Sequence, residues 1–119
     1  MAKILSMPAG SAVTPISIQE TLTGVSSSNP YSKSVPNLNA GGLTIVCSVE
    51  TDASTVVALD KTSATLLVNG VSVQGTSSGS GRTATYTFNT AVPANAAIIF
   101  TLEVSGTAAV FTGTFELNN

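Results

Sequence analysis

The sequence ATLLVNGVSVQ, residues 64–74, places the dipeptide Asn69-Gly70 between two apolar runs. Asn-Gly is the pair that best tolerates positive φ at both central positions of a type I′ turn, which joins two strands through two residues. In such a hairpin four apolar side chains form cross-strand pairs on one face of the sheet: Leu66 with Val73, and Val68 with Val71. Turn chemistry and hydrophobic alternation therefore agree on a β-hairpin.

The remainder of the chain repeats this alternation of apolar and polar residues, which is typical of half-buried strands. It predicts further strands at 12–19, 43–50, 83–89, 97–104 and 110–117, and a short one at 55–59. With roughly seven to nine short strands and no helical period, we expect an all-β fold. The specific prediction is an antiparallel two-sheet β-sandwich, with immunoglobulin-like or jelly-roll-like topology left open.

Apolar residues on the inward positions of these strands form the predicted core: Ile45, Val49, Leu66, Val68, Val71, Val73, Phe88, Phe100, Leu102, Phe111 and Phe115. We expect Ser105-Gly106-Thr107 to join the last two strands as a hairpin. We expect Gly113 to mark a bulge or a bend, because glycine inside a strand weakens the regular ladder.

A chain of 119 residues is the size of one domain. We predict an N-terminal arm at 1–11 and a single β-sandwich domain at 12–119. Residues 20–42 are dense in Ser, Asn, Pro and Gly, which predicts a long turn-rich connection whose only candidate strand is 21–25. The Gly- and Ser-rich segment 75–81 is predicted to be a flexible loop.

Charged residues make up only 8% of the chain, and the net charge is −2. This composition excludes the basic surface that nucleic-acid binding requires. No apolar run approaches the length of a membrane-spanning helix, and the N-terminus lacks the hydrophobic region of a signal peptide. We therefore expect synthesis in the cytoplasm, with no membrane partner.

The residues needed for common catalysis are scarce. The chain has no histidine, and its single cysteine, Cys47, shares a strand face with apolar residues, which predicts an inert core thiol. We therefore expect no enzyme. Glu50, Asp52 and Asp60 offer oxygens to Ca²⁺ but lack a known loop spacing, so we expect turn residues and no metal or cofactor.

Threonine rows occur on two predicted strands: Thr83, Thr85 and Thr87 on one, and Thr112 and Thr114 on the other. A flat, regular row of hydroxyls offers a surface for ice or glycans. More commonly, such a row is the solvated face of a sheet, because threonine favours strands and its hydroxyl hydrates an uncharged surface.

The chain as a whole resembles the small virion proteins of tailed bacteriophages. The resemblance lies in the short start, the Ser/Thr/Gly/Ala/Asn-rich β domain, the few charges, the absence of histidine and the N-terminal arm, and in no motif. It is greatest to the decoration (cement) proteins of the capsid exterior. It implies a structural virion protein that is often oligomeric, stabilises the phage head, and binds the major capsid protein or another virion protein.

Apolar residues that the sandwich core does not require are the predicted partner contacts: Ile4, Leu5 and Met7 in the arm, and Tyr31, Val35 and Leu38 in the connection. Exposed apolar area of this kind marks interaction surfaces. The alternative function is a receptor- or glycan-binding module of a phage fibre, a baseplate or a bacterial surface structure, which would bind through its loops.

Overall fold

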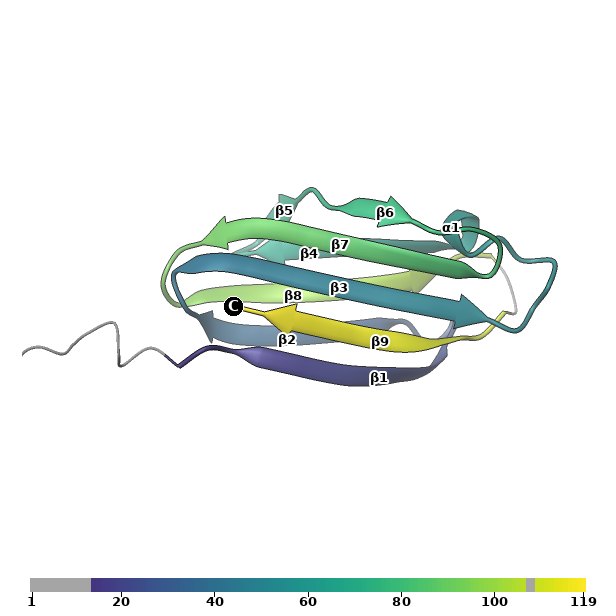
Figure 1. The fold of residues 1–119 in the computed structure, drawn as a ribbon, viewed down its shortest axis with the longest axis horizontal. Helices are drawn as coiled ribbons and strands as arrows, with labels where there is room; N and C mark the ends of the chain where they lie inside the picture. Colours follow the sequence, from purple (N-terminus) through teal and green to yellow (C-terminus); the bar gives the residue numbers. More distant parts are fainter. Residues whose placement is uncertain (1–13, 107–108) are drawn as a thin grey trace, which may run out of the picture.

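The computed structural model describes residues 14–106 and 109–119, which form two antiparallel sheets packed face to face (Figure 1). In chain order the elements are β1 (Ser17–Val25), β2 (Tyr31–Leu38), β3 (Gly41–Thr51), α1 (Ala58–Lys61), β4 (Thr62–Val68), β5 (Val71–Val73), β6 (Thr76–Ser78), β7 (Thr83–Val92), β8 (Ala96–Val104) and β9 (Phe111–Asn118). The predicted β-sandwich is confirmed. The predicted arm at 1–11 lies outside the described residues.

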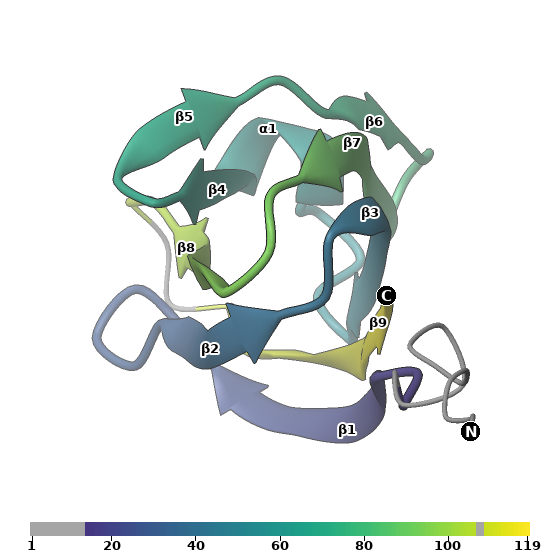
Figure 2. The same cartoon turned by 90° about the vertical axis from the view of Figure 1, so that its left-hand side faces the viewer.

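The two sheets are formed by one long antiparallel ribbon whose two halves pair on either side of the Asn69-Gly70 turn. The five-stranded sheet has the order β1-β9-β3-β7-β6, and the four-stranded sheet has the order β2-β8-β4-β5. Four strand pairs lie at increasing distance along the chain from the Asn69-Gly70 turn: β4 with β5, β3 with β7, β2 with β8 and β1 with β9. A paired ribbon wound over itself in this way is a jelly roll, so the topology that the sequence left open is decided (Figure 2).

The turn at the tip of this ribbon has the predicted geometry. Asn69 has φ 50° and Gly70 has φ 83°, as a type I′ turn requires. The predicted pairs, Leu66 with Val73 and Val68 with Val71, are present. However, Val71 is 67% exposed, and the prediction that it belongs to the core is wrong. Its strand, β5, is the three-residue outer strand of its sheet, so no strand flanks Val71 on the other side.

The hydrophobic core lies between the sheets and is centred on phenylalanine rings. The Phe100 ring centroid lies 5.1 Å from that of Phe115 and 6.0 Å from that of Phe88, so strands of both sheets meet there. These rings are at most 3% exposed. Burying a side chain of this kind contributes about 1.5–3 kcal/mol. Rings from opposite sheets therefore join the two layers.

Residues 20–42, predicted as a turn-rich connection, instead form most of β1 and all of β2. The apolar residues of these strands are spaced by three positions, Leu22 to Val25 and Val35 to Leu38, and each interval contains a register shift. Gly24 (φ 66°) and Asn37 (φ 61°) supply the left-handed backbone at these bulges. The predicted strand 12–19 and the candidate strand 21–25 are thus two parts of β1, and of these two strands only β2 was not predicted. The bulges break the two-residue alternation, which explains why β1 was divided and β2 was missed.

Three local predictions are also wrong. The segment 55–59 contains no strand: its last two residues begin α1, where the Ala58 N–H donates to the carbonyl of Gly81 at 2.8 Å. The segment 75–81 is not entirely loop, because β6 pairs with β7. β8 and β9 do not form the hairpin predicted across 105–107, since they belong to different sheets.

Gly113 allows an unusually close approach of two central strands. It pairs with Val49 on β3 and with Leu22 on β1, and the register shift that was expected near it lies in β1. A β-carbon on Gly113 would overlap the carbonyl oxygen of Ser48. Glycine is therefore required there by the packing of β9 against β3.

Candidate functional site

The structure places the predicted contact residues of segment 20–42 in or against the core. Val35 is 7% and Leu38 is 1% exposed, because both point between the sheets, so they cannot form an exposed contact surface. Tyr31 is half-buried and packs on Phe115 and Phe100, with ring centroids 5.6 and 6.3 Å away. The other predicted contacts, Ile4, Leu5 and Met7, lie outside the described residues.

Tyr31 joins the two sheets at their β1–β2 edge. Its hydroxyl donates to Glu20 on β1 at 2.5 Å, and the Lys33 ammonium group on β2 donates to the same carboxylate at 2.5 Å. Lys33 and Tyr31 hydrogen bonds lower the pKa of Glu20. Burial, and then the bond to Glu20, raise the pKa of Tyr31. At neutral pH, Glu20 is therefore ionised and Tyr31 is neutral. The contact among Glu20, Tyr31 and Lys33 connects β1 to β2, and we call it the latch.

The thiol and the carboxylates among the described residues are not arranged as a reactive or metal-binding site. Cys47 is fully buried, and burial raises the pKa of its thiol to about 12, as expected for the predicted core thiol. In residues 14–106 and 109–119, no three cysteine or carboxylate side chains come close enough to hold a metal ion. The same part of the chain contains no helix with the length and hydropathy needed to cross a bilayer.

One end of the sandwich carries no charged residue and is braced by asparagines. It consists of residues 37–42, 69–70 and 93–96 with the described chain ends at 14–16 and 119, and we call it the asparagine end (Figure 1). Asn119 donates to the carbonyls of Asn39 and Gly42 at 3.2 and 2.8 Å, and Asn69 accepts from the N–H of Ala97 at 3.0 Å. Three separate loops are thus held as one surface.

The chain enters the described structure at this end. The Asn39 side chain donates to the carbonyl oxygen of Thr14 at 2.8 Å, and the Asn119 N–H donates to the carbonyl of Ile16 at 2.9 Å. These bonds hold Thr14 and Ile16 at the asparagine end. The predicted arm, residues 1–11, precedes these residues in the sequence.

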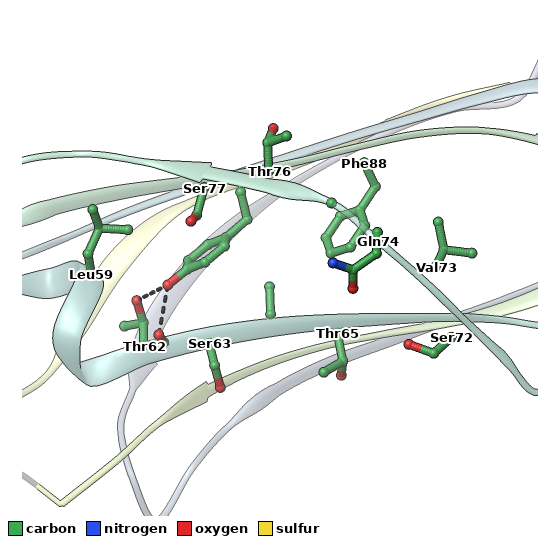
Figure 3. Close-up of a pocket in the computed structure, with 13 residues that line it drawn as sticks. Leu59, Thr62, Ser63, Thr65, Ser72, Val73, Gln74, Thr76, Ser77 and Phe88 are labelled. Atoms are coloured by element: carbon green, nitrogen blue, oxygen red, sulfur yellow. Dashed lines mark hydrogen bonds between the residues drawn. The ribbon is translucent and has the colours of Figure 1, made fainter.

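A crevice of about 280 Å³ opens on the edge of the sandwich opposite β1 and β2, between β4 and the segment that crosses from β5 to β6 (Figure 3). Leu59, Val73, Tyr86 and Phe88 contribute apolar surface; Gln74 belongs to the crossing segment and Ser77 to β6. The Tyr86 hydroxyl lies 2.6 Å from Thr62 Oγ1 and 2.8 Å from the Thr62 carbonyl oxygen. No residue that lines the crevice is charged.

The predicted threonine rows lie on the outward face of the five-stranded sheet. Paired positions form a row of hydroxyls across all five strands: Thr21, Thr114, Ser48, Thr85 and Ser78. Beside this row is a hollow of about 350 Å³ whose lining includes five hydroxyl side chains and the carboxylate of Glu50. We call this surface the hydroxyl face. It offers hydrogen bonds without positive charge.

Comparisons of the chain with protein-family models, curated protein sequences and solved structures found no match. Three surfaces of the described structure are candidates for binding: the asparagine end, the crevice and the hydroxyl face. Only the hydroxyl face was predicted in part, because threonine spacing is visible along a single strand. The other two join residues from distant segments, and strand alternation carries no signal for them.

Proposed function

We propose that this chain is a non-enzymatic structural protein on the surface of an assembly, specifically a decoration protein on the exterior of a tailed-phage head. On this proposal it is made in the host cytoplasm and resides in the virion. It binds the major capsid protein or another virion protein, and it associates with copies of itself.

The observation that carries the proposal is the asparagine end. Its loops hold no charged residue, and hydrogen bonds between Asn39, Asn119 and the backbone hold them rigidly. Depletion of charge is characteristic of the central part of protein interfaces, and a pre-organised surface loses little entropy on binding. The apolar residues Ile4, Leu5 and Met7 are attached to this end through Thr14. Uncharged surface and apolar arm together suit a docking function.

Two further observations support a structural role. Jelly rolls occur in viral capsid and lectin domains, although the fold by itself does not specify function. The described carboxylates are dispersed over several strands and loops, and the single thiol is buried. The buried thiol is therefore out of reach of a substrate, and the chain has no histidine to serve as a base.

Deletion of residues 1–11 tests the proposal. We expect the truncated protein to keep its β-sheet circular dichroism spectrum and its unfolding midpoint. We also expect it to lose association with phage heads that lack the protein, and to lose self-association in size-exclusion chromatography with light scattering. A triple variant, Ile4→Ser, Leu5→Ser and Met7→Ser, keeps the arm length and should behave in the same way.

A matched control removes exposed apolar surface at the end opposite the asparagine end. Val110 is 51% exposed, and Val110→Ser should leave association unchanged. If the truncated protein associates as the full chain does, the proposal loses its support. If it unfolds, the arm belongs to the fold and not to a docking surface.

Glycan binding is the second candidate function, and the hollow on the hydroxyl face favours it. Five hydroxyls and one carboxylate can exchange hydrogen bonds with the hydroxyls of a neutral sugar. A glycan panel probed with the wild-type protein and with Glu50→Gln tests this function. Binding that weakens in the variant would support it, and absence of binding by the wild type would refute it.

A further inference from the structure

The crevice exists because β5 stops early. β5 pairs with β4 only from Leu66 to Val68, and the chain then crosses at Gln74-Gly75 to the other sheet. Residues 62–65 of β4 consequently have β8 on one side and the crevice on the other. The crevice therefore lies on the side of β4 where a longer β5 would pair.

One backbone donor and one acceptor face this space. In a two-residue hairpin the pairs Val68–Val71 and Leu66–Val73 exchange N–H···O bonds, and the direction alternates along the strand. Ala64 therefore turns its N–H and its C=O toward the crevice, and no described residue pairs with them there. Both groups of Thr62 are already engaged, since its N–H donates to Ala58 and its C=O accepts from Tyr86.

The lining favours an uncharged, extended peptide with apolar side chains. Leu59, Val73 and Ala64 line the crevice and are only partly buried, and Tyr86 and Phe88 lie beneath it. The Gln74 carboxamide extends over the opening, and no hydrogen bond within the described chain holds it (Figure 3). An added strand would bond to Ala64 and insert alternate side chains toward the apolar floor.

We infer that the crevice receives residues 1–11 of a second copy, which add as a strand beside β4. The inference rests on the proposed function, because it names the surface that accepts the arm. The arm carries one charge, on Lys3, and in an extended conformation Leu5 and Met7 point to the same side. Pro8 then ends the segment that can donate to a neighbour.

The acceptor is a second copy because of where the arm departs. Residue 14 precedes β1, which is one outer strand of the five-stranded sheet, whereas the crevice adjoins β6, the other outer strand (Figure 2). Because the donor and acceptor surfaces differ, two copies that exchange their arms form a closed dimer, whereas one-way donation from copy to copy closes a ring or extends around the particle.

Disulfide cross-linking between two different single-cysteine variants tests the inference. One full-length variant carries Leu5→Cys and the other carries Ser77→Cys at the crevice. Native Cys47 is fully buried and does not interfere. Mild oxidation of the mixture should give a covalent dimer. Leu5→Cys mixed with Thr114→Cys, which lies on the exposed hydroxyl face, is the control and should give none.

A second measurement fills the crevice. Gln74 is exposed, so Gln74→Phe should fold normally and block the entry of a strand, whereas Gln74→Ala keeps the crevice open. We expect self-association at least tenfold weaker for Gln74→Phe and unchanged for Gln74→Ala. Wild-type association of Gln74→Phe together with no cross-link to position 77 would overturn the inference. A third variant carries both Leu5→Cys and Ser77→Cys in one chain. If only this variant forms a cross-link, and forms it within the chain, the acceptor is not a second copy.

The experiments distinguish failure of the proposed function from failure of the inference about the crevice alone. If deletion of residues 1–11 leaves association intact, the proposed function fails and the inference fails with it. If the deletion abolishes association but the crevice variants behave as wild type, the arm docks elsewhere, and only the inference about the crevice is lost.

Discussion

Substitution of Gly113 by alanine tests the packing at the centre of the five-stranded sheet. Gly113 lies on β9 between Leu22 of β1 and Val49 of β3. A β-carbon there would overlap the Ser48 carbonyl oxygen and lie 2.8 Å from both the Ser48 carbonyl carbon and the Val49 α-carbon. All three atoms belong to backbone, so no side-chain rotation can relieve the overlap. β3 and β9 would have to separate along several ladder hydrogen bonds.

The expected loss of stability follows from this geometry. Overpacking a well-packed interior typically costs about 1–3 kcal/mol, and a backbone overlap between two central strands belongs at the upper limit. We therefore expect Gly113→Ala to lower the free energy of unfolding by about 3 kcal/mol or more. A domain of this length is stable by roughly 6–18 kcal/mol, so the variant should still fold but be clearly weakened.

Urea unfolding followed by circular dichroism measures this loss. With a slope of about 2 kcal/mol per molar, the midpoint should fall by about 1.5 M. Gly42→Ala is the matched control, since Gly42 lies in β3 and a β-carbon on it would have no neighbour within 4 Å. The control should be neutral or gain up to about 1 kcal/mol through the unfolded state. An unchanged midpoint for Gly113→Ala would refute the close approach of β9 and β3.

Three other predictions concern the turn, the buried thiol and the latch. Gly70→Val should lower the free energy of unfolding in urea by more than about 1 kcal/mol, because Gly70 has φ 83°. Gly70→Asn should lower it less, because asparagine tolerates this backbone conformation, and equal midpoints for the two variants would argue against the type I′ turn. Cys47 should resist a thiol reagent at pH 8 until the protein unfolds. Because burial raises its pKa to about 12 in the folded state, its contribution to stability should be full below the unfolded pKa of about 8.5 and decline as pH rises toward 12; rapid native labelling would contradict its burial. Glu20→Gln should cost at most about 1 kcal/mol at pH 7, since the bridge to Lys33 is partly exposed. Because the pKa of Glu20 is lowered on folding, that difference should vanish as pH falls well below 4.5, and a cost that persists in acid would indicate a packing effect instead.

The sequence by itself determined the class of fold and the elements whose signals are local. Two-residue alternation located β3, β7, β8 and β9, because an inward apolar residue is followed by an outward polar one wherever a strand has one buried face. The Asn69-Gly70 turn was also predicted from the sequence, since positive φ at two successive residues is a local steric requirement. Burial of Cys47 followed from the same alternation.

The tertiary structure alone decided how the ribbon is wound and which surfaces it creates. In β1 and β2 the bulges at Gly24 and Asn37 space the apolar residues by three, and the pairing that defines these bulges is with β9 and β8, far along the chain. The choice of jelly-roll topology likewise depends on contacts between distant strands, which periodicity within one strand does not encode. The asparagine end and the crevice exist only because that winding brings their segments together, so the surfaces on which the proposed function depends belong to the fold and not to any motif.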